Sequence, residues 1–332
     1  MYYKHRRYLL MNNFTASLFK KLVALSLSLV FVFAFAAISP SVSAAELMFS
    51  PDASPKFLRL SGKITENNGD TIRIRRIDTD ALYDDVILNV TDKTVAIDAV
   101  SGDTIAIADL KVGDVIYVHT SPAMTRSIPP RTTVEAIVAN VPQDGFGVPN
   151  YVEVRGIEKN ADGSIRILDE NQDIIATIRD SAEFLPYENG SKRVLGLDDI
   201  KPGTKMFMWY DIVALSLPGQ TTPYKFKVMP YSYSCYIEAN EEQLIVNGRE
   251  VATVKSERPY KDNGVLMIPL KKTVESIGCL MYWNEAGTEL NVVGRGTNVS
   301  ISPEDLVVKD GKVFLPYYDM GSILNAKIVG LN

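Results

Sequence analysis

The sequence predicts a mainly β protein with a C-terminal α+β module: two tandem small β-barrels, followed by a twisted antiparallel sheet packed on a helix. Short runs rich in β-branched residues alternate with polar positions, and turn signals such as Asn68-Gly69-Asp70 separate them roughly every eight to twelve residues. The segment 57–142 is repeated, at a spacing of about 90 residues, by the segment 150–231. Helical spacing of apolar residues begins only after residue 238, which places the α+β module at 238–330.

Four pairs of short segments carry the repeat. In each pair the glycines, prolines or apolar residues fall at matching places; the pairs are 62–69 with 156–163, 86–92 with 174–180, 109–113 with 199–203, and 127–133 with 216–222. Units of this size suit a closed five- or six-stranded barrel, and we favour the partly open barrel of the oligonucleotide/oligosaccharide-binding type. The linker between the copies is predicted at 142–150.

The C-terminal module is predicted from a change of pattern. Asn247-Gly248 indicates a hairpin turn, and a following strand ends at Pro269. Leu270, Val274 and Ile277 then follow at helical spacing, and Gly278 is placed to end that helix. The strand-Pro-helix order recurs around Pro316, so two such units are expected.

Several motifs of this module resemble the copper amine oxidase N-terminal-like domain, a module of secreted Gram-positive proteins. They are Val-Asn-Gly-Arg at 246–249, Pro259, Asn-Gly-x-x-Met-Ile-Pro-Leu at 263–270, Glu-Ser-Ile-Gly at 275–278, Trp-Asn at 283–284 and Asp-Gly-x-x-Phe-Leu-Pro at 310–316. The resemblance covers 238–330 and implies the fold of the oxidase stalk, a twisted antiparallel sheet around a helix. It implies no oxidase chemistry, because that stalk carries neither copper nor an active site.

The first 45 residues have the order of a secretory signal peptide. Basic residues precede the apolar run Leu22–Ile38, and the small residues Val42-Ser43-Ala44 follow it. The alternative is a membrane anchor, since the run approaches the ~20 residues that span a bilayer. We expect cleavage after Ala44 or Ala45, a flexible lead-in at 46–56, and a secreted, extracellular protein with the cell wall as a candidate location.

The charge balance excludes two classes of partner. Those 45 residues hold five Lys or Arg and no acid, so the remainder has 30 basic and 40 acidic residues, a net charge of −10. Nucleic acids and anionic membranes both select clustered Lys and Arg. We therefore expect no nucleic acid and, after signal cleavage, no membrane as partner; cell-wall polymer or another envelope protein remains.

Catalytic and metal-binding patterns are weak. His119 is the one histidine after residue 45, which excludes sites built on several imidazoles. Its counterpart in the second copy is Trp209, which favours packing or a surface position over catalysis. No Gly-x-Ser-x-Gly or P-loop motif is present. We therefore expect a non-enzyme with no cofactor, no catalytic residue and no metal ligand.

Acidic residues leave one catalytic alternative open. Three adjacent pairs, at 84–85, 198–199 and 241–242, are expected in solvated turns, since neighbours on a strand point to opposite faces. The acidic segments 160–164 and 169–173 lack the complete calcium loop with its distal Glu, so hairpin turns are favoured there. A glycosidase would instead need two carboxylates set across a cleft.

Two features suggest binding surfaces. The first is a proline loop present in both copies, formed by Ser127, Ile128, Pro129 and Pro130 in one and by Ser216, Leu217 and Pro218 in the other. It is either a recognition edge or a barrel corner stiffened by proline. The second is Tyr231 and Tyr233, which share one face of a strand. They form either an aromatic surface for glycans or packing at the junction with the C-terminal module.

Cys235 and Cys279 are the two cysteines of the chain. In an oxidising compartment an even count permits a disulfide, and the alternative is two buried thiols. These observations predict a secreted, non-catalytic interaction or scaffold protein of the cell envelope or extracellular matrix. The alternatives are a secreted glycan-acting hydrolase that uses a carboxylate pair, or a regulator of a partner enzyme.

Overall fold

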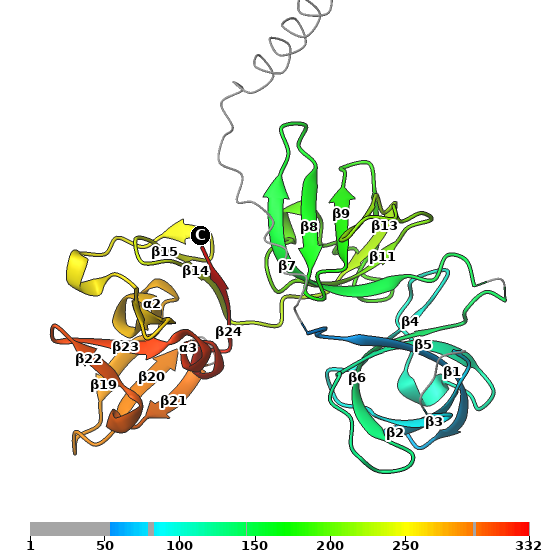
Figure 1. Cartoon of the computed structure of the whole chain (residues 1–332), viewed down its shortest axis with the longest axis horizontal. Helices are drawn as coiled ribbons and strands as arrows, with labels where there is room; N and C mark the ends of the chain where they lie inside the picture. The colour runs from blue at the N-terminus through cyan, green and yellow to red at the C-terminus, as the bar shows by residue number, and fades with distance from the viewer. Residues whose placement is uncertain (1–53, 79–82, 144, 295–296, 332) are drawn as a thin grey trace, which may run out of the picture. The chain divides into compact units, whose positions relative to one another are not determined.

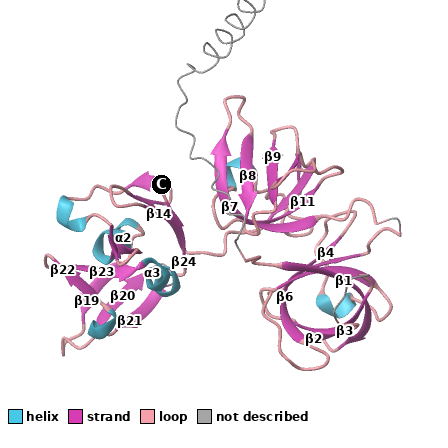
Figure 2. Cartoon of the chain, viewed as in Figure 1, coloured by secondary structure: helices cyan, strands magenta, loops and turns pink. Residues whose placement is uncertain are grey.

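The computed structural model describes residues 54–78, 83–143, 145–294 and 297–331 (Figure 1). All of them belong to one compact unit, Ala45–Asn332. The expected signal peptide and most of the expected lead-in lie outside the described residues. Among the helices that are described, none is both long and apolar enough to span a membrane. The protein is mainly β with a C-terminal α+β region, as predicted (Figure 2).

The first barrel is a closed ring of five strands with one additional edge strand. Its elements are β1 (Leu58–Asn67), β2 (Thr71–Arg76), β3 (Asp85–Asn89), β4 (Val95–Asp98), η1 (Ile107–Asp109), β5 (Val115–Thr120) and β6 (Arg131–Ala139). The sheet order β3-β2-β1-β5-β6 closes through a parallel β3–β6 pairing, and β4 adds to β6. This ring is the predicted oligonucleotide/oligosaccharide-binding topology. Alternating apolar residues such as Ile64, Ile72 and Leu88 fill its interior.

The second barrel repeats this order with one strand divided. Its elements are β7 (Asn150–Lys159), β8 (Ile165–Asp169), β9 (Ile174–Ile178), β10 (Glu183–Phe184), η2 (Leu197–Asp199), β11 (Lys205–Trp209), β12 (Gly219–Thr221) and β13 (Lys225–Val228). β12 pairs parallel with β9 and β13 pairs with β11, the two roles that β6 alone fills in the first barrel. Pro223 lies between β12 and β13, and because proline has no N–H to donate, it interrupts the strand.

The strand pairing in the two barrels corrects one detail of the alignment between the two copies. Ser61 pairs with Tyr117 in the first barrel and Tyr151 with Phe207 in the second, so Gly62 corresponds to Val152 and not to Gly156. The β7–β8 hairpin extends further than the β1–β2 hairpin, which makes the turn glycines Gly69 and Gly163 match while the strands before them are shifted.

The C-terminal module contains three small sheets and two helices. Its elements are β14 (Cys235–Ala239), β15 (Leu244–Val246), β16 (Arg249–Glu250), η3 (Lys255–Glu257), β17 (Tyr260–Asp262), β18 (Val265–Pro269), α2 (Leu270–Ser276), β19 (Leu280–Trp283), β20 (Leu290–Gly294), β21 (Thr297–Ile301), η4 (Pro303–Asp305), β22 (Val307–Lys309), β23 (Lys312–Pro316), α3 (Tyr317–Leu324) and β24 (Ala326–Gly330). The sheet orders are β16-β15-β14-β24, β17-β18-β23-β22 and β19-β20-β21.

Both expected strand-Pro-helix units are present. β18 and β23 lie side by side and antiparallel, each ends at a proline, and each leads directly into a helix. Gly278 (φ 73°) and Asn325 (φ 46°) follow the helices in the left-handed region, where glycine and asparagine are favoured. The antiparallel strands of this module are divided among three sheets, and the β14–β24 pairing is parallel.

Candidate functional site

The two proline loops have the same local structure. In the first barrel the Ile128–Pro129 peptide is cis, and the Ser127 hydroxyl donates to the carbonyl of Pro129 at 2.8 Å. In the second, Leu217–Pro218 is cis, and Ser216 donates to the Pro218 carbonyl at 2.7 Å. The serine therefore holds the turn from within in both copies, and the aliphatic side chain before the proline faces solvent.

The tips of these loops are exposed to an unusual degree for aliphatic residues. Ile128 is 89% exposed and Leu217 is 76% exposed. The second loop adds Ile212 and Leu215, also exposed, whereas the first has Arg126 where the second has Leu215. Each loop joins the fourth and fifth strands of its five-stranded ring, β5 to β6 and β11 to β12. In this barrel type the loop between those strands contributes to ligand binding.

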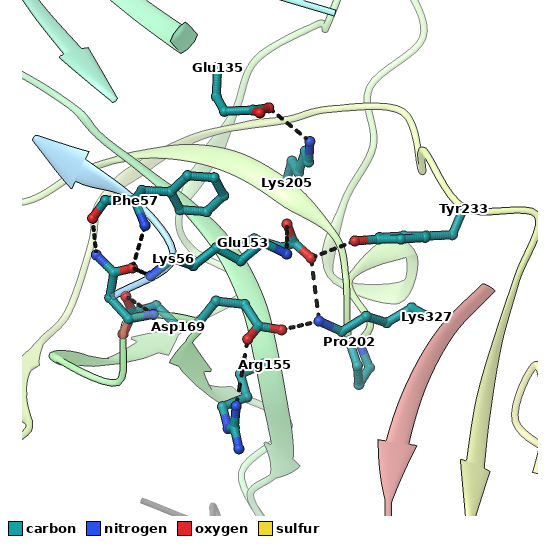
Figure 3. Close-up of polar contacts among 12 residues, drawn as sticks. Lys56, Phe57, Glu135, Glu153, Arg155, Asp169, Pro202, Lys205, Tyr233 and Lys327 are labelled. Atoms are coloured by element: carbon teal, nitrogen blue, oxygen red, sulfur yellow. Dashed lines mark hydrogen bonds and ion pairs between the residues drawn. The ribbon is translucent and has the colours of Figure 1, made fainter. Parts of the chain in front are cut away.

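A second group of functional interest surrounds Glu153 on β7 (Figure 3). Its carboxylate is fully buried in the second barrel, yet three segments distant in sequence reach it. Lys56 of the lead-in lies 3.1 Å from Oε2, Lys327 of β24 lies 3.4 Å from Oε1, and the Tyr233 hydroxyl donates to Oε1 at 3.0 Å. Oε2 has no aligned hydrogen-bond donor among the described residues, so the Lys56 contact is an ion pair only. We call Lys56, Glu153, Glu170, Tyr233 and Lys327 the Glu153 cluster.

The charges of the Glu153 cluster cancel, because two lysines pair with two glutamates. Burial alone would raise the pKa of Glu153, but the charges of Lys56 and Lys327, with the hydrogen bond from Tyr233, outweigh burial and hold that pKa below its ordinary value. Lys327 also contacts Glu170, which Arg155 approaches at 3.6 Å. An ionised carboxylate that two ammonium groups neutralise is a poor proton acceptor, so this cluster suits holding segments together.

Tyr231 and Tyr233, the candidate aromatic surface, are only partly exposed. Tyr231 and Tyr233 are half-buried: Tyr231 donates to the Pro202 carbonyl at 3.0 Å beneath Lys201, whose ammonium lies 4.0 Å from the ring centre, and Tyr233 belongs to the Glu153 cluster. In the structure the two tyrosines therefore pack at the junction between the second barrel and the C-terminal module, the second of the two alternatives.

Of the two alternatives for the cysteines, the structure has two buried thiols. Cys235 and Cys279 are free thiols buried in the core of the C-terminal module. The Cys279 thiol donates to the Gly294 carbonyl at 3.2 Å, and burial raises the pKa of the Cys235 thiol to about 11. Both side chains thus act as small apolar core residues, and neither fixes the module to a barrel.

His119 packs where the two barrels meet. Its ring is buried, lies 5.6 Å from the ring of Tyr151, and has Nε2 2.9 Å from Oδ1 of Asn150. Burial lowers the pKa of His119 to about 4, against the opposing effect of the Asn150 hydrogen bond. Trp209, its counterpart, is buried in the same apolar cluster and donates to the Ala99 carbonyl at 2.7 Å. Both copies use this position for packing, as expected.

The acidic loop after β8 secures the lead-in. The side-chain oxygen of Asn171 accepts from the backbone N–H groups of Lys56 and Phe57, and its amide donates to the Phe57 carbonyl. Asp169 accepts from three backbone N–H groups of its own loop, and burial, together with the nearby charge of Asp173, raises the pKa of Asp169 to about 7. Among the described residues no group of three or more potential ligands is arranged to hold a metal ion.

One acid of each adjacent pair makes a structural contact within its own module. Asp85 forms ion pairs with Arg73 and Arg75 on the face of β2. Asp199 accepts from the backbone N–H of Gly196 at the start of η2, and Glu241 accepts from that of Lys261. These contacts explain the acids as partners within their own modules.

The sequence did not reveal Glu153 or Lys227 as buried charged residues. Glu153 alternates with Val152 and Val154, which fill the barrel, so the pattern places it on the outer face. That face is covered by segments far away in the sequence. Lys227 is buried in the same manner, and its ammonium donates to the Gly102 carbonyl of the first barrel at 2.8 Å. A single sequence carries no signal for such coverage.

Comparison with known proteins gives no assignment: no protein-family model matches the chain, and no curated protein sequence matches it significantly.

Proposed function

We propose that this protein is a secreted, non-catalytic interaction protein of the cell envelope or extracellular matrix, and that the proline loops contact its partner. One observation carries the proposal: two copies of the barrel hold an aliphatic side chain outward by the same serine-to-carbonyl hydrogen bond. Removing such side chains from water stabilises a complex by roughly 1.5–3 kcal/mol each. The loop position agrees with the binding edge of this barrel type, by fold analogy alone.

The ligand class follows from charge. The chain after residue 45 has a net charge of −10, which disfavours nucleic acid and anionic polymers, and the loop tips are aliphatic. An uncharged wall polymer or an apolar patch on another envelope protein fits these tips. Within this proposal, residues 238–330 are a copper amine oxidase N-terminal-like module that serves as a stalk.

Retention on isolated Gram-positive cell walls tests the proposal. We expect the secreted protein to be retained, and the variant Ile128→Ser with Leu217→Ser to bind at least tenfold more weakly. Val112→Ser is the matched control, because Val112 is 66% exposed on the first barrel but lies outside the loops. Equal binding of the double variant and the control, or no retention of the unmodified protein on walls, peptidoglycan or envelope proteins, would remove the support.

The competing hydrolase hypothesis has a separate measurement. A panel of polysaccharides would be incubated with the protein and assayed for new reducing ends. Turnover that disappears when one Asp or Glu is replaced by its amide would replace the binding proposal by a glycan-acting enzyme. Release of no reducing ends from a polymer that the protein retains would support binding without chemistry.

A further inference from the structure

Strand β19 is an edge strand without the usual protection. It lies at one side of the sheet β19-β20-β21, and its residues Leu280, Met281, Tyr282 and Trp283 carry no charge (Figure 1). Leu280 is 72%, Tyr282 53% and Trp283 46% exposed. Natural sheets normally protect such edges with charged residues, proline or a covering segment, because open N–H and C=O groups pair readily with another strand.

The other edge strands of the same module differ from β19. Each carries charged or strongly polar side chains, namely Arg249 and Glu250 on β16, Lys261 and Asp262 on β17, Asn298 and Ser300 on β21, Lys309 on β22 and Lys327 on β24. β19 therefore stands out within its own module as the edge that combines exposed large apolar side chains with the absence of polar protection.

The hydrogen-bond pattern shows which backbone groups are open. Asn284 N–H donates to the Glu289 carbonyl directly opposite, so it belongs to a hydrogen-bonded pair of the β19–β20 ladder. Since these pairs alternate along a strand, Tyr282 and Leu280 also point their backbone groups toward β20. The N–H and C=O groups of Met281 and Trp283 then point to the free edge, and none of the described residues bonds to them.

The side chains of β19 complement those of a second β19. Leu280 and Tyr282 share the outer face, while Met281 packs against the core of the module. If two strands pair antiparallel about a two-fold axis at Met281, Leu280 of each copy lies opposite Tyr282 of the other, on the same face. The two Met281 residues exchange backbone hydrogen bonds, and each Trp283 N–H can reach the Cys279 carbonyl of the other copy, whose own N–H is already bonded to Val274.

We propose that β19 is the docking edge for a second copy of this chain, joined antiparallel about Met281 into one continuous six-stranded sheet. A two-fold arrangement uses the same surface on both copies and closes on itself, so it gives a dimer and no filament. The contact is short, and the dimer therefore dissociates on dilution.

Sedimentation equilibrium tests this with the protein recovered after expression of the full sequence. Over roughly 1 μM to 1 mM we expect a monomer–dimer equilibrium. The variant Leu280→Lys with Tyr282→Lys places like charges opposite each other twice, and we expect its dimer to be at least tenfold weaker. The variant Leu280→Lys with Tyr282→Glu removes the same apolar surface but places opposite charges together, so it regains dimer. Val308→Lys, on the exposed edge β22, is the control and leaves the equilibrium unchanged.

Amide hydrogen exchange gives an independent readout of the register. On raising the concentration, the Met281 and Trp283 amides become protected, whereas those of Leu280 and Tyr282, already bonded to β20, change little. A chain that stays monomeric at the highest concentration, a dimer that tolerates the two lysines, or a lysine–glutamate variant no stronger than the lysine–lysine variant would each overturn the proposal.

Discussion

The two barrels share a topology, yet equivalent positions have opposite roles where the second barrel is covered. Lys63 in the first barrel corresponds to Glu153 in the second; Lys63 is exposed, and Glu153 is fully buried beneath Lys56, Tyr233 and Lys327. The duplicated face is therefore a docking surface in one copy and a solvent surface in the other.

The turn beside this face shows the same contrast. Gly113 and Gly203 occupy equivalent turns with positive φ, and each donates its N–H into the bulge of the barrel's first strand. A Cβ on Gly113 would meet only the flexible end of Lys63, at 3.8 Å, whereas a Cβ on Gly203 would lie 2.9 Å from the ring of Tyr233. The turn of the second barrel is thus closely covered, and that of the first is open.

The largest effect is expected from breaking the Glu153 cluster. Lys327→Met leaves two carboxylates close together with one cation fewer, and removing one partner of a buried ion pair costs about 3–5 kcal/mol of unfolding free energy. Lys63 lies on the equivalent face of the first barrel and is exposed. Its replacement, Lys63→Met, should change the unfolding free energy by less than about 0.5 kcal/mol. Urea unfolding of both variants measures the difference; equal losses would mean that the buried cluster contributes no more than an exposed lysine.

One pH effect should come from a carboxyl that the first barrel lacks. Asp169 occupies the position of Ile74, and its pKa is raised from 3.8 to about 7. The folded state then binds the proton more tightly than the unfolded state, so this contribution is complete below about pH 4 and is lost as pH rises through about 7.

Asp169→Asn removes the titration and keeps an oxygen for the backbone N–H groups. The variant's unfolding free energy, measured from pH 4 to 8 against the unmodified protein, should lack this decline. His119 contributes with the opposite sign, because its pKa is lowered to about 4 and its stabilisation is lost as pH falls below about 6.5. A variant profile parallel to that of the unmodified protein would contradict the role of Asp169.

Alanine at the two turn glycines gives a smaller, matched comparison. Both substitutions place a Cβ at positive φ, which costs about 1–2 kcal/mol. Gly203→Ala adds the overlap with Tyr233, so its melting temperature should fall further than that of Gly113→Ala. A larger loss for Gly113→Ala would show that Tyr233 moves away without cost.

The smallest effect on stability is expected at the loop tips. Ile128→Ser and Leu217→Ser change side chains that already face water, so the unfolding free energy should shift by no more than about 0.5 kcal/mol. Thermal unfolding checks this. A large loss in either variant would assign that loop to the architecture of its barrel and would weaken its use as a binding surface.

Sequence pattern predicted what depends on local alternation. The barrels, the strand-Pro-helix units, the helix stop at Gly278 and the shared loop containing Pro129 or Pro218 all follow from residues close in sequence. What depended on contacts between distant segments was missed. Alternation with Val152 and Val154 places Glu153 only on the outer face of the barrel and does not show what covers that face. An even cysteine count could not distinguish Cys235 and Cys279 as partners from two small core residues.

The Glu153 cluster can be completed only at the end of synthesis of the chain. A polypeptide grows from its N-terminus, so Lys327 emerges after every other member of the cluster, and β24 brings it into place by pairing with β14. Until then Lys56 is the cation paired with Glu153 among the described residues, and the turn at Gly203 lacks its contact with Lys327. A chain that stops before β24 therefore keeps Glu153 and Glu170 close together without the ammonium of Lys327, and we expect it to be less stable than the finished chain.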